Sequence, residues 1–134
     1  SMNDQVLKVL RELRSFPNIT FKGNQDPAIA EEWLSEIEFR FGSLGVTDSL
    51  LMAKVAPNLF SSSAVQWWKG RIAVYGDVEL TWVEFRKIFL EKYVSLTYIN
   101  KMKSDFLKLV QGTDSVSVYV QKFEEYSRYA PEYV

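Results

Sequence analysis

Apolar residues recur at steps of three and four positions along nearly the whole chain, and this spacing most constrains its fold. The period matches the turn of an α-helix and places the apolar side chains on one face. No run of alternating β-branched residues, bounded by turn signals, reaches the length of a strand. The sequence therefore predicts an all-α protein.

Residues that favour helix ends divide this pattern into segments. Pro17 ends a first amphipathic helix over residues 6–16. This helix is too short for a stable coiled coil by itself, so it either docks on the rest of the chain or pairs with another chain. Asp26 is a suitable N-cap and Pro27 a suitable first residue for a second helix, which Gly45 ends.

The middle of the chain predicts two further helices. Thr47 is the expected cap of the third helix, and Pro57 kinks or ends that helix. A serine cluster at 61–63 opens the fourth helix, which closes near Gly76. Both segments carry apolar residues at helical spacing.

A capping box begins the fifth helix. The Thr81 hydroxyl and the Glu84 carboxylate can each accept a hydrogen bond from an otherwise unpaired backbone N–H. Two more helices are expected, over about residues 97–110 and 115–129. We place a boundary between two lobes near residues 95–97, where the aromatic pattern lapses and a new cap begins.

Composition excludes several classes of function. The 134-residue chain is 47% hydrophobic, which is enough to build a core in one domain or two small lobes. It contains no cysteine and no histidine, so we expect no disulfide, cofactor or metal site. Short apolar runs interrupted by charge argue against a transmembrane helix. A net charge of −1 argues against a nucleic-acid-binding surface.

The sequence shows no catalytic constellation. Without histidine or cysteine, the commonest pairs of nucleophile and base cannot be built. Adjacent carboxylates, such as Glu31 with Glu32 and Glu124 with Glu125, fit the solvated surface of a helix. We therefore expect no enzymatic activity and no catalytic, cofactor-binding or metal-binding residues.

Aromatic residues supply the candidate core. Trp67 and Trp68 are neighbours whose side chains point about 100° apart on a helix, so at most one can lie in the centre of the core. Trp82 is expected to be buried against Trp33 or Trp67. Burial is the favoured interpretation of the whole set, and a groove that accepts a short peptide is the alternative. The set is Phe21, Trp33, Trp67, Trp68, Trp82, Phe85 and Phe89.

Four ordered blocks of sequence resemble a known family. The blocks are Phe21–Pro27 with Trp33-Leu34 and Ile37-Glu38, Ala64–Trp68, Thr81–Phe85 with Phe89 and Tyr93, and Gln111–Phe123 continuing to Pro131. In this order and spacing, residues 18–134 resemble the Gag capsid region of gypsy-type long-terminal-repeat retrotransposons, plant elements in particular. The last block, over residues 111–129, resembles the major homology region of retroelement capsids. Domesticated neuronal capsid proteins belong to the same family.

The resemblance implies a domain organisation. Residues 1–17 form an N-terminal helix, residues 18–94 a capsid N-terminal lobe, and residues 97–134 the start of an incomplete C-terminal lobe. We interpret Ser1-Met2 as a cloning remnant.

It also implies a function. Gag capsid proteins are structural and self-associate into virus-like particle shells around element RNA, in the cytoplasm, with a nuclear phase left open. Regions outside this chain would bind the RNA, since the zinc knuckle of such proteins lies further downstream. The alternative is a domesticated adaptor that binds a short peptide in an aromatic groove.

The homology-like region suggests how copies associate. The resemblance implies that Gln111 and Gly112 form a turn that braces the following helix. The chain departs from the family pattern at Val118, where a glutamate would usually complete a capping box with Ser115. Two short helices make a poor core, so we expect residues 97–129 to form a homodimer, by swapping, or to fold back on the N-terminal lobe. The candidate assembly residues are Gln111, Gly112, Ser115, Tyr119, Phe123, Ile99, Met102, Phe106 and Leu109.

Overall fold

The computed structural model describes residues 1–111, 120, 124 and 125, and most of these residues are helical. The elements are α1 (Met2–Leu13), α2 (Pro27–Ser43), α3 (Ser49–Val55), the 3-10 helix η1 (Ala56–Leu59), α4 (Ser63–Tyr75), α5 (Trp82–Tyr93) and α6 (Leu96–Gln111). Among the described residues there is no strand, only an isolated bridge between Phe21 and Phe60. The predicted all-α class is confirmed. The helix predicted over 115–129 lies outside the described residues.

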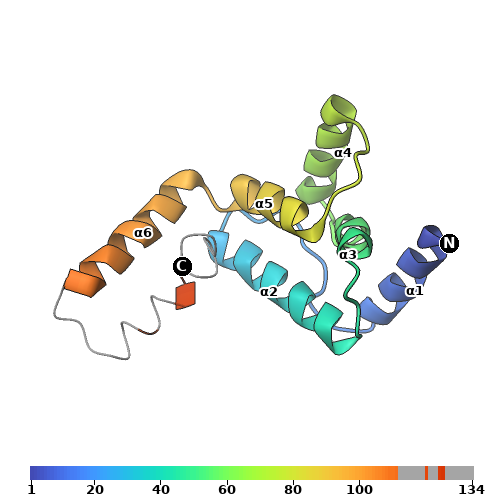
Figure 1. Cartoon of the computed structure of the whole chain (residues 1–134). Helices are drawn as coiled ribbons and strands as arrows, with labels where there is room; N and C mark the ends of the chain where they lie inside the picture. The colour runs from blue at the N-terminus through green and yellow to red at the C-terminus, as the bar shows by residue number, and fades with distance from the viewer. Residues whose placement is uncertain (112–119, 121–123, 126–134) are drawn as a thin grey trace.

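Two helices form the centre of the molecule. Figure 1 shows α2 and α5 side by side, with α3 and α1 on one side and α6 extending on the other. α4 projects away from this body (Figure 1). The break between α5 and α6 falls at residues 94–95, next to the predicted lobe boundary.

The helix starts follow from capping side chains. Asp26 caps α2, and its Oδ1 accepts a hydrogen bond from the backbone N–H of Ala28 at 3.0 Å. The Thr81–Glu84 capping box at the start of α5 is present as predicted. The predicted cap of α3 was wrong by one residue. Asp48 rather than Thr47 caps it, because the Asp48 carboxylate accepts from two backbone N–H groups of the first turn.

α1 begins and ends earlier than predicted. Its N-cap is Ser1, one of the two residues set aside as a cloning remnant. It ends at Leu13, and Phe16 lies beyond it with the Arg40 guanidinium 4.0 Å from its ring centroid. The helix docks on α3 of its own chain through three buried side chains. These are Val9, Leu10 and Leu13.

An aromatic cluster forms the centre of the core. Phe89 has no exposed surface, and its ring centroid lies 5.0 to 6.2 Å from five other aromatic rings. Those rings belong to Phe21, Trp33, Phe60, Phe85 and Tyr93. The buried indole N–H of Trp33 donates to the carbonyl oxygen of Ile19 at 2.8 Å. Rings from four separate segments therefore close one core.

The loop before α2 is fastened to the segment before α4. The Phe21 backbone N–H donates to the Leu59 carbonyl at 2.9 Å, and the Ser61 N–H donates to the Phe21 carbonyl at 2.8 Å. Gly23 follows with φ +93° and lies against Ser63, where a side chain would collide with the start of α4. The base of α4 is thus fixed to the core.

Candidate functional site

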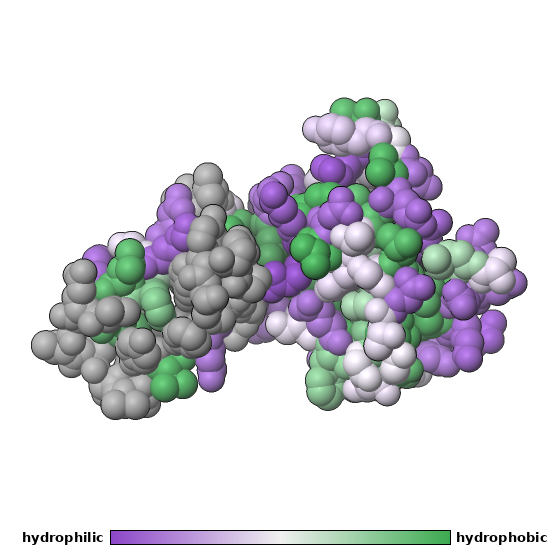
Figure 2. Space-filling view, in the orientation of Figure 1, coloured by the Kyte–Doolittle hydropathy of each residue, from purple (hydrophilic) through white to green (hydrophobic). Residues whose placement is uncertain are grey.

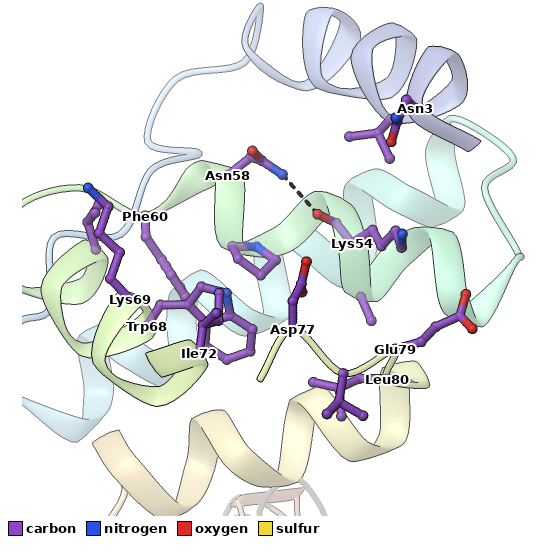
Figure 3. Close-up of a pocket in the computed structure, with 15 residues that line it drawn as sticks. Asn3, Lys54, Asn58, Phe60, Trp68, Lys69, Ile72, Asp77, Glu79 and Leu80 are labelled. Carbon is purple, nitrogen blue, oxygen red and sulfur yellow. Dashed lines mark hydrogen bonds between the residues drawn. The ribbon is translucent and has the colours of Figure 1, made fainter. Parts of the chain in front are cut away.

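A groove of about 600 Å³ lies between α4, the loop over residues 76–80, α3 and the first turns of α1 (Figure 3). A second hollow of about 280 Å³ adjoins it between α4 and the same loop. Both are lined by Trp68, Ile72, Val78 and Leu80, and Tyr75 lines the second. We call these five residues the α4 patch.

The α4 patch exists because α4 buries little of itself. Ala64 is its only buried residue among the 13 of the helix. Trp67 and Trp68 are half-buried, with ring centroids 5.2 Å from Tyr93 and 5.6 Å from Phe85. Beyond them the helix leaves the body, as Figure 1 shows. Its apolar side chains then meet solvent rather than core.

The end of α4 is the most apolar exposed part of this helix. Val74 is 74% exposed, Tyr75 64% and Val78, in the following loop, 61%. Figure 2 shows hydrophobic surface at the tip of α4, at the top of the view. The Arg71 guanidinium lies 4.6 Å from the centroid of the Tyr75 ring. Exposed apolar residues gathered in this way are a candidate surface for contact with another molecule.

Charged side chains stand at the two ends of the groove. Lys69 on α4 lies at one end, and Asp77 and Glu79 in the loop lie towards the other (Figure 3). Lys54 on α3 also lines the second end. The ion pairs between described residues include none of these four side chains. The groove therefore presents charges of both signs to a ligand.

The entry into α4 has unusual backbone geometry. Ser62, its N-cap residue, has φ 52° and ψ −129°, a conformation that residues with a side chain rarely adopt. Its side chain makes no capping hydrogen bond. The neighbouring Ser63 hydroxyl donates instead to the Lys22 carbonyl oxygen at 3.1 Å. The packed loop at the base, not a cap, holds α4 in place.

Most of the predicted aromatic set is core and does not line an open groove. Exposed fractions are 8% or less for Phe21, Trp33, Trp82, Phe85 and Phe89. Of the seven, only Trp68 lines the α4 groove. Phe21 and Trp33 lie at another hollow, of about 570 Å³, beside α2. Three members of the set therefore line a hollow, and most of the rings pack on one another.

Trp82 is buried as predicted, but its predicted neighbours were wrong. Its ring centroid lies 5.5 Å from that of Phe41 and 5.1 Å from that of Phe85, rather than against Trp33 or Trp67. The indole N–H donates to Glu38 Oε2 at 2.9 Å. Trp82 thereby joins α5 to α2.

The predicted assembly residues fall into two groups. Met102 and Leu109 on α6 are buried, and Ile99 and Phe106 are half-buried. Met102 belongs to the main core cluster. Gln111 ends α6. The remaining four lie outside the described residues, namely Gly112, Ser115, Tyr119 and Phe123.

Among the residues that the structure describes, two ionisable groups have shifted pKa values, and neither lines the groove. The backbone N–H and the hydroxyl of Thr81 donate to the Glu84 carboxylate, and these hydrogen bonds lower its pKa. Burial raises the pKa of the Tyr93 phenol. Both shifts belong to the fold.

The described residues offer few other kinds of site. No three acidic side chains among them are grouped so that they could hold a metal ion. None of the described helices combines the length and apolarity that crossing a bilayer requires. Comparison with protein-family models, curated proteins and solved structures found no match.

Sequence reasoning missed the α4 groove and the central position of Phe60. A signal for the groove was present in Val74, Tyr75 and Val78, three apolar residues around the helix-ending Gly76. Their exposure could not be read from the sequence, because it depends on the direction in which α4 leaves the body.

Proposed function

We propose that this chain is a structural Gag capsid protein of the gypsy-type retrotransposon class, which self-associates into shells and has no enzymatic activity. One observation carries the proposal. The first three blocks that resemble this family, which are far apart in the sequence, all contribute rings to a single aromatic core. The resemblance therefore rests on the residues that hold the fold together rather than on scattered surface positions.

The proposed organisation follows the helices. Residues 18–94 act as a capsid N-terminal lobe, to which α1 is added, and residues 97–134 begin the C-terminal lobe. Weak contacts between lobes, multiplied over many copies, close a shell. The C-terminal region contributes a homodimer contact through residues 97–129. The particles form in the cytoplasm, and any nuclear phase is a property of the complete protein.

RNA binding is assigned to regions outside this chain. The net charge of −1 is too small and of the wrong sign for a surface that neutralises several phosphates. Titration of labelled single-stranded RNA at low salt should therefore give weak binding with little dependence on ionic strength. Submicromolar affinity that collapses as salt rises would indicate a nucleic-acid-binding function instead.

A capsid-like adaptor is the second candidate, and the α4 groove is the observation that favours it. The groove has room for a short peptide and carries Trp68, Ile72 and Phe60 in its lining. In this alternative the groove accepts a peptide while the chain remains monomeric. The genomic reading frame distinguishes the two functions. A zinc knuckle, a protease and a reverse transcriptase encoded downstream would favour the retrotransposon capsid, and an isolated cellular gene would favour the adaptor.

Assembly of a longer protein tests the proposed function. The protein is extended through the complete C-terminal lobe and examined by light scattering and negative-stain microscopy. A capsid protein gives closed particles of regular diameter. A soluble species that stays monomeric at high concentration would contradict the proposal and favour the adaptor.

A further inference from the structure

We propose that the α4 patch is a two-fold contact between two copies of this chain. This inference rests on the proposed self-association and adds a second surface to it, distinct from residues 97–129. In the contact, the patch of one copy packs on the patch of the other. Lys69 of each copy pairs with Glu79 of its partner.

Exposure of apolar surface is the first argument. Tyr75 and Val78 are 64% and 61% exposed, and Trp68, Ile72 and Leu80 are half-buried beside them. A partner that covered them would remove apolar surface from water, which is the main favourable term in association. Figure 1 shows that the far end of α4 stands clear of the other helices, so a second molecule reaches this end without moving a described helix.

The layout of charge is the second argument, and it selects the occupant. A two-fold contact whose axis crosses the groove at right angles to its length places each end of the groove against the opposite end of the partner's groove. Figure 3 shows Lys69 and Glu79 at opposite ends of the groove, with Trp68 and Ile72 between them. The two-fold operation therefore sets Lys69 against Glu79 twice, on either side of an apolar centre.

A different protein fits these charges less well. A uniformly acidic or basic partner would satisfy one end of the patch and be repelled by the other. Lys54 lies near Asp77 and Glu79 and reduces the negative charge at that end without cancelling it, since the end carries two carboxylates. A second copy of the chain carries one basic and one acidic end, so it complements both ends of the patch.

Charge-reversal variants test the contact in the full 134-residue chain. Lys69→Glu and Glu79→Lys each create two like-charge pairs in the homodimer, so each should weaken dimerisation about tenfold or more. In an equimolar mixture, the first variant meets the second with both opposite-charge pairs restored. Sedimentation velocity of each variant and of the mixture, at matched concentration and low salt, measures this pattern.

Controls separate this contact from other effects. Lys87→Glu makes the same change at an exposed position on α5 and should leave dimerisation unaltered. Val78→Asp places a charge in the apolar centre and should abolish the contact in homodimers and mixtures alike. Lys69 and Glu79 are both exposed, so circular dichroism should show native helix content in all variants.

Each outcome decides the inference. Dimer loss in the single variants with recovery in the mixture supports it. A wild type that is monomeric at high concentration overturns it, as does a dimer that Lys69→Glu and Glu79→Lys leave intact. In the last case, disruption by Phe106→Asp with Phe123→Asp would still support self-association through residues 97–129, so the proposed function stands or fails separately.

Discussion

α4 and α5 are of nearly equal length and both are rich in aromatic residues, yet they have opposite roles. α5 buries Trp82, Phe85, Phe89 and Tyr93 together with Leu90. α4 buries Ala64 alone and points its end into solvent. The aromatic residues of α5 follow one another at steps of three, four and four residues, so they form one stripe. On α4, Trp67 and Trp68 are adjacent, and Trp68 is followed by Ile72 and Tyr75 at steps of four and three residues.

The difference shows that aromatic content alone does not identify a core. A single stripe can be covered by one neighbouring surface, and α2 with the loop at Phe21 covers the stripe of α5. On α4, the adjacent Trp67 and Trp68 point about 100° apart, so the surface that packs on one does not cover the face of the other. On α4 the first turns are packed, and apolar residues near the end of the helix, such as Val74 and Tyr75, are exposed.

The largest expected effect is the loss of a ring from the core. Phe89→Ala should destabilise the fold by about 3–5 kcal/mol, since the cavity would lie among five other rings. The matched change on α4, Tyr75→Ala, should alter the free energy of unfolding by less than about 0.5 kcal/mol. Urea denaturation measures both. Equal losses of stability from the two substitutions would contradict the view that α5 forms the core while the end of α4 does not.

The attachment of α4 is tested at Gly23. A Cβ at this position meets the Ser63 hydroxyl and lies 2.8 Å from the Ala64 backbone nitrogen, and φ is +93°. Gly23→Ala should therefore destabilise by about 2–4 kcal/mol, from strain and overlap together. Gly45→Ala is the control, because φ is +71° but the space is open, so strain of about 1 kcal/mol remains. Thermal unfolding of both variants should rank them in this order.

A smaller effect is expected for the polar contact of Trp82. Trp82→Phe keeps most of the ring but removes the N–H that donates to Glu38 at 2.9 Å. Arg86 lies 3.6 Å from the same Glu38 oxygen, so this carboxylate keeps one partner. We expect a loss of about 1–2 kcal/mol in unfolding free energy. If Trp82→Phe and a Trp82→Phe, Glu38→Gln double variant are both as stable as wild type, the hydrogen bond contributes nothing.

The smallest effect concerns pH and the capping box. The pKa of Glu84 is lowered in the fold, so its carboxylate stabilises α5 above the ordinary glutamate pKa. This contribution is lost as pH falls through the lowered folded value. Glu84→Gln keeps an acceptor for the Thr81 N–H but does not titrate. The melting temperature of wild type should fall slightly more than that of the variant between pH 7 and pH 3, and parallel curves would contradict this.

Local signals in the sequence predicted the helices well. Asp26 and the Thr81–Glu84 box cap α2 and α5 as expected, because capping depends on a few neighbouring residues. The error at α3 arose where Thr47 and Asp48 were both capable of capping. The side chain that reaches two N–H groups caps the helix, and reach depends on the backbone conformation.

Contacts between helices were harder to predict. The burial of Trp82 followed from its position after a cap, but its contact with Phe41 depends on the register between α2 and α5. Likewise, the sequence predicted α4 but not its direction, which the loop at Gly23 and Phe21 determines. The α4 patch could therefore be recognised only in the structure.

Hydrogen exchange at two protein concentrations tests the central claim most directly. The claim is that α2 and α5 hold the fold while α4 presents a contact surface to a second copy. At low concentration, amides of α2 and α5 should be the most protected and those of residues 70–78 among the least. At high concentration, protection should rise over residues 68–80 and stay constant in α5. Unchanged exchange over residues 68–80 at every concentration would contradict the account.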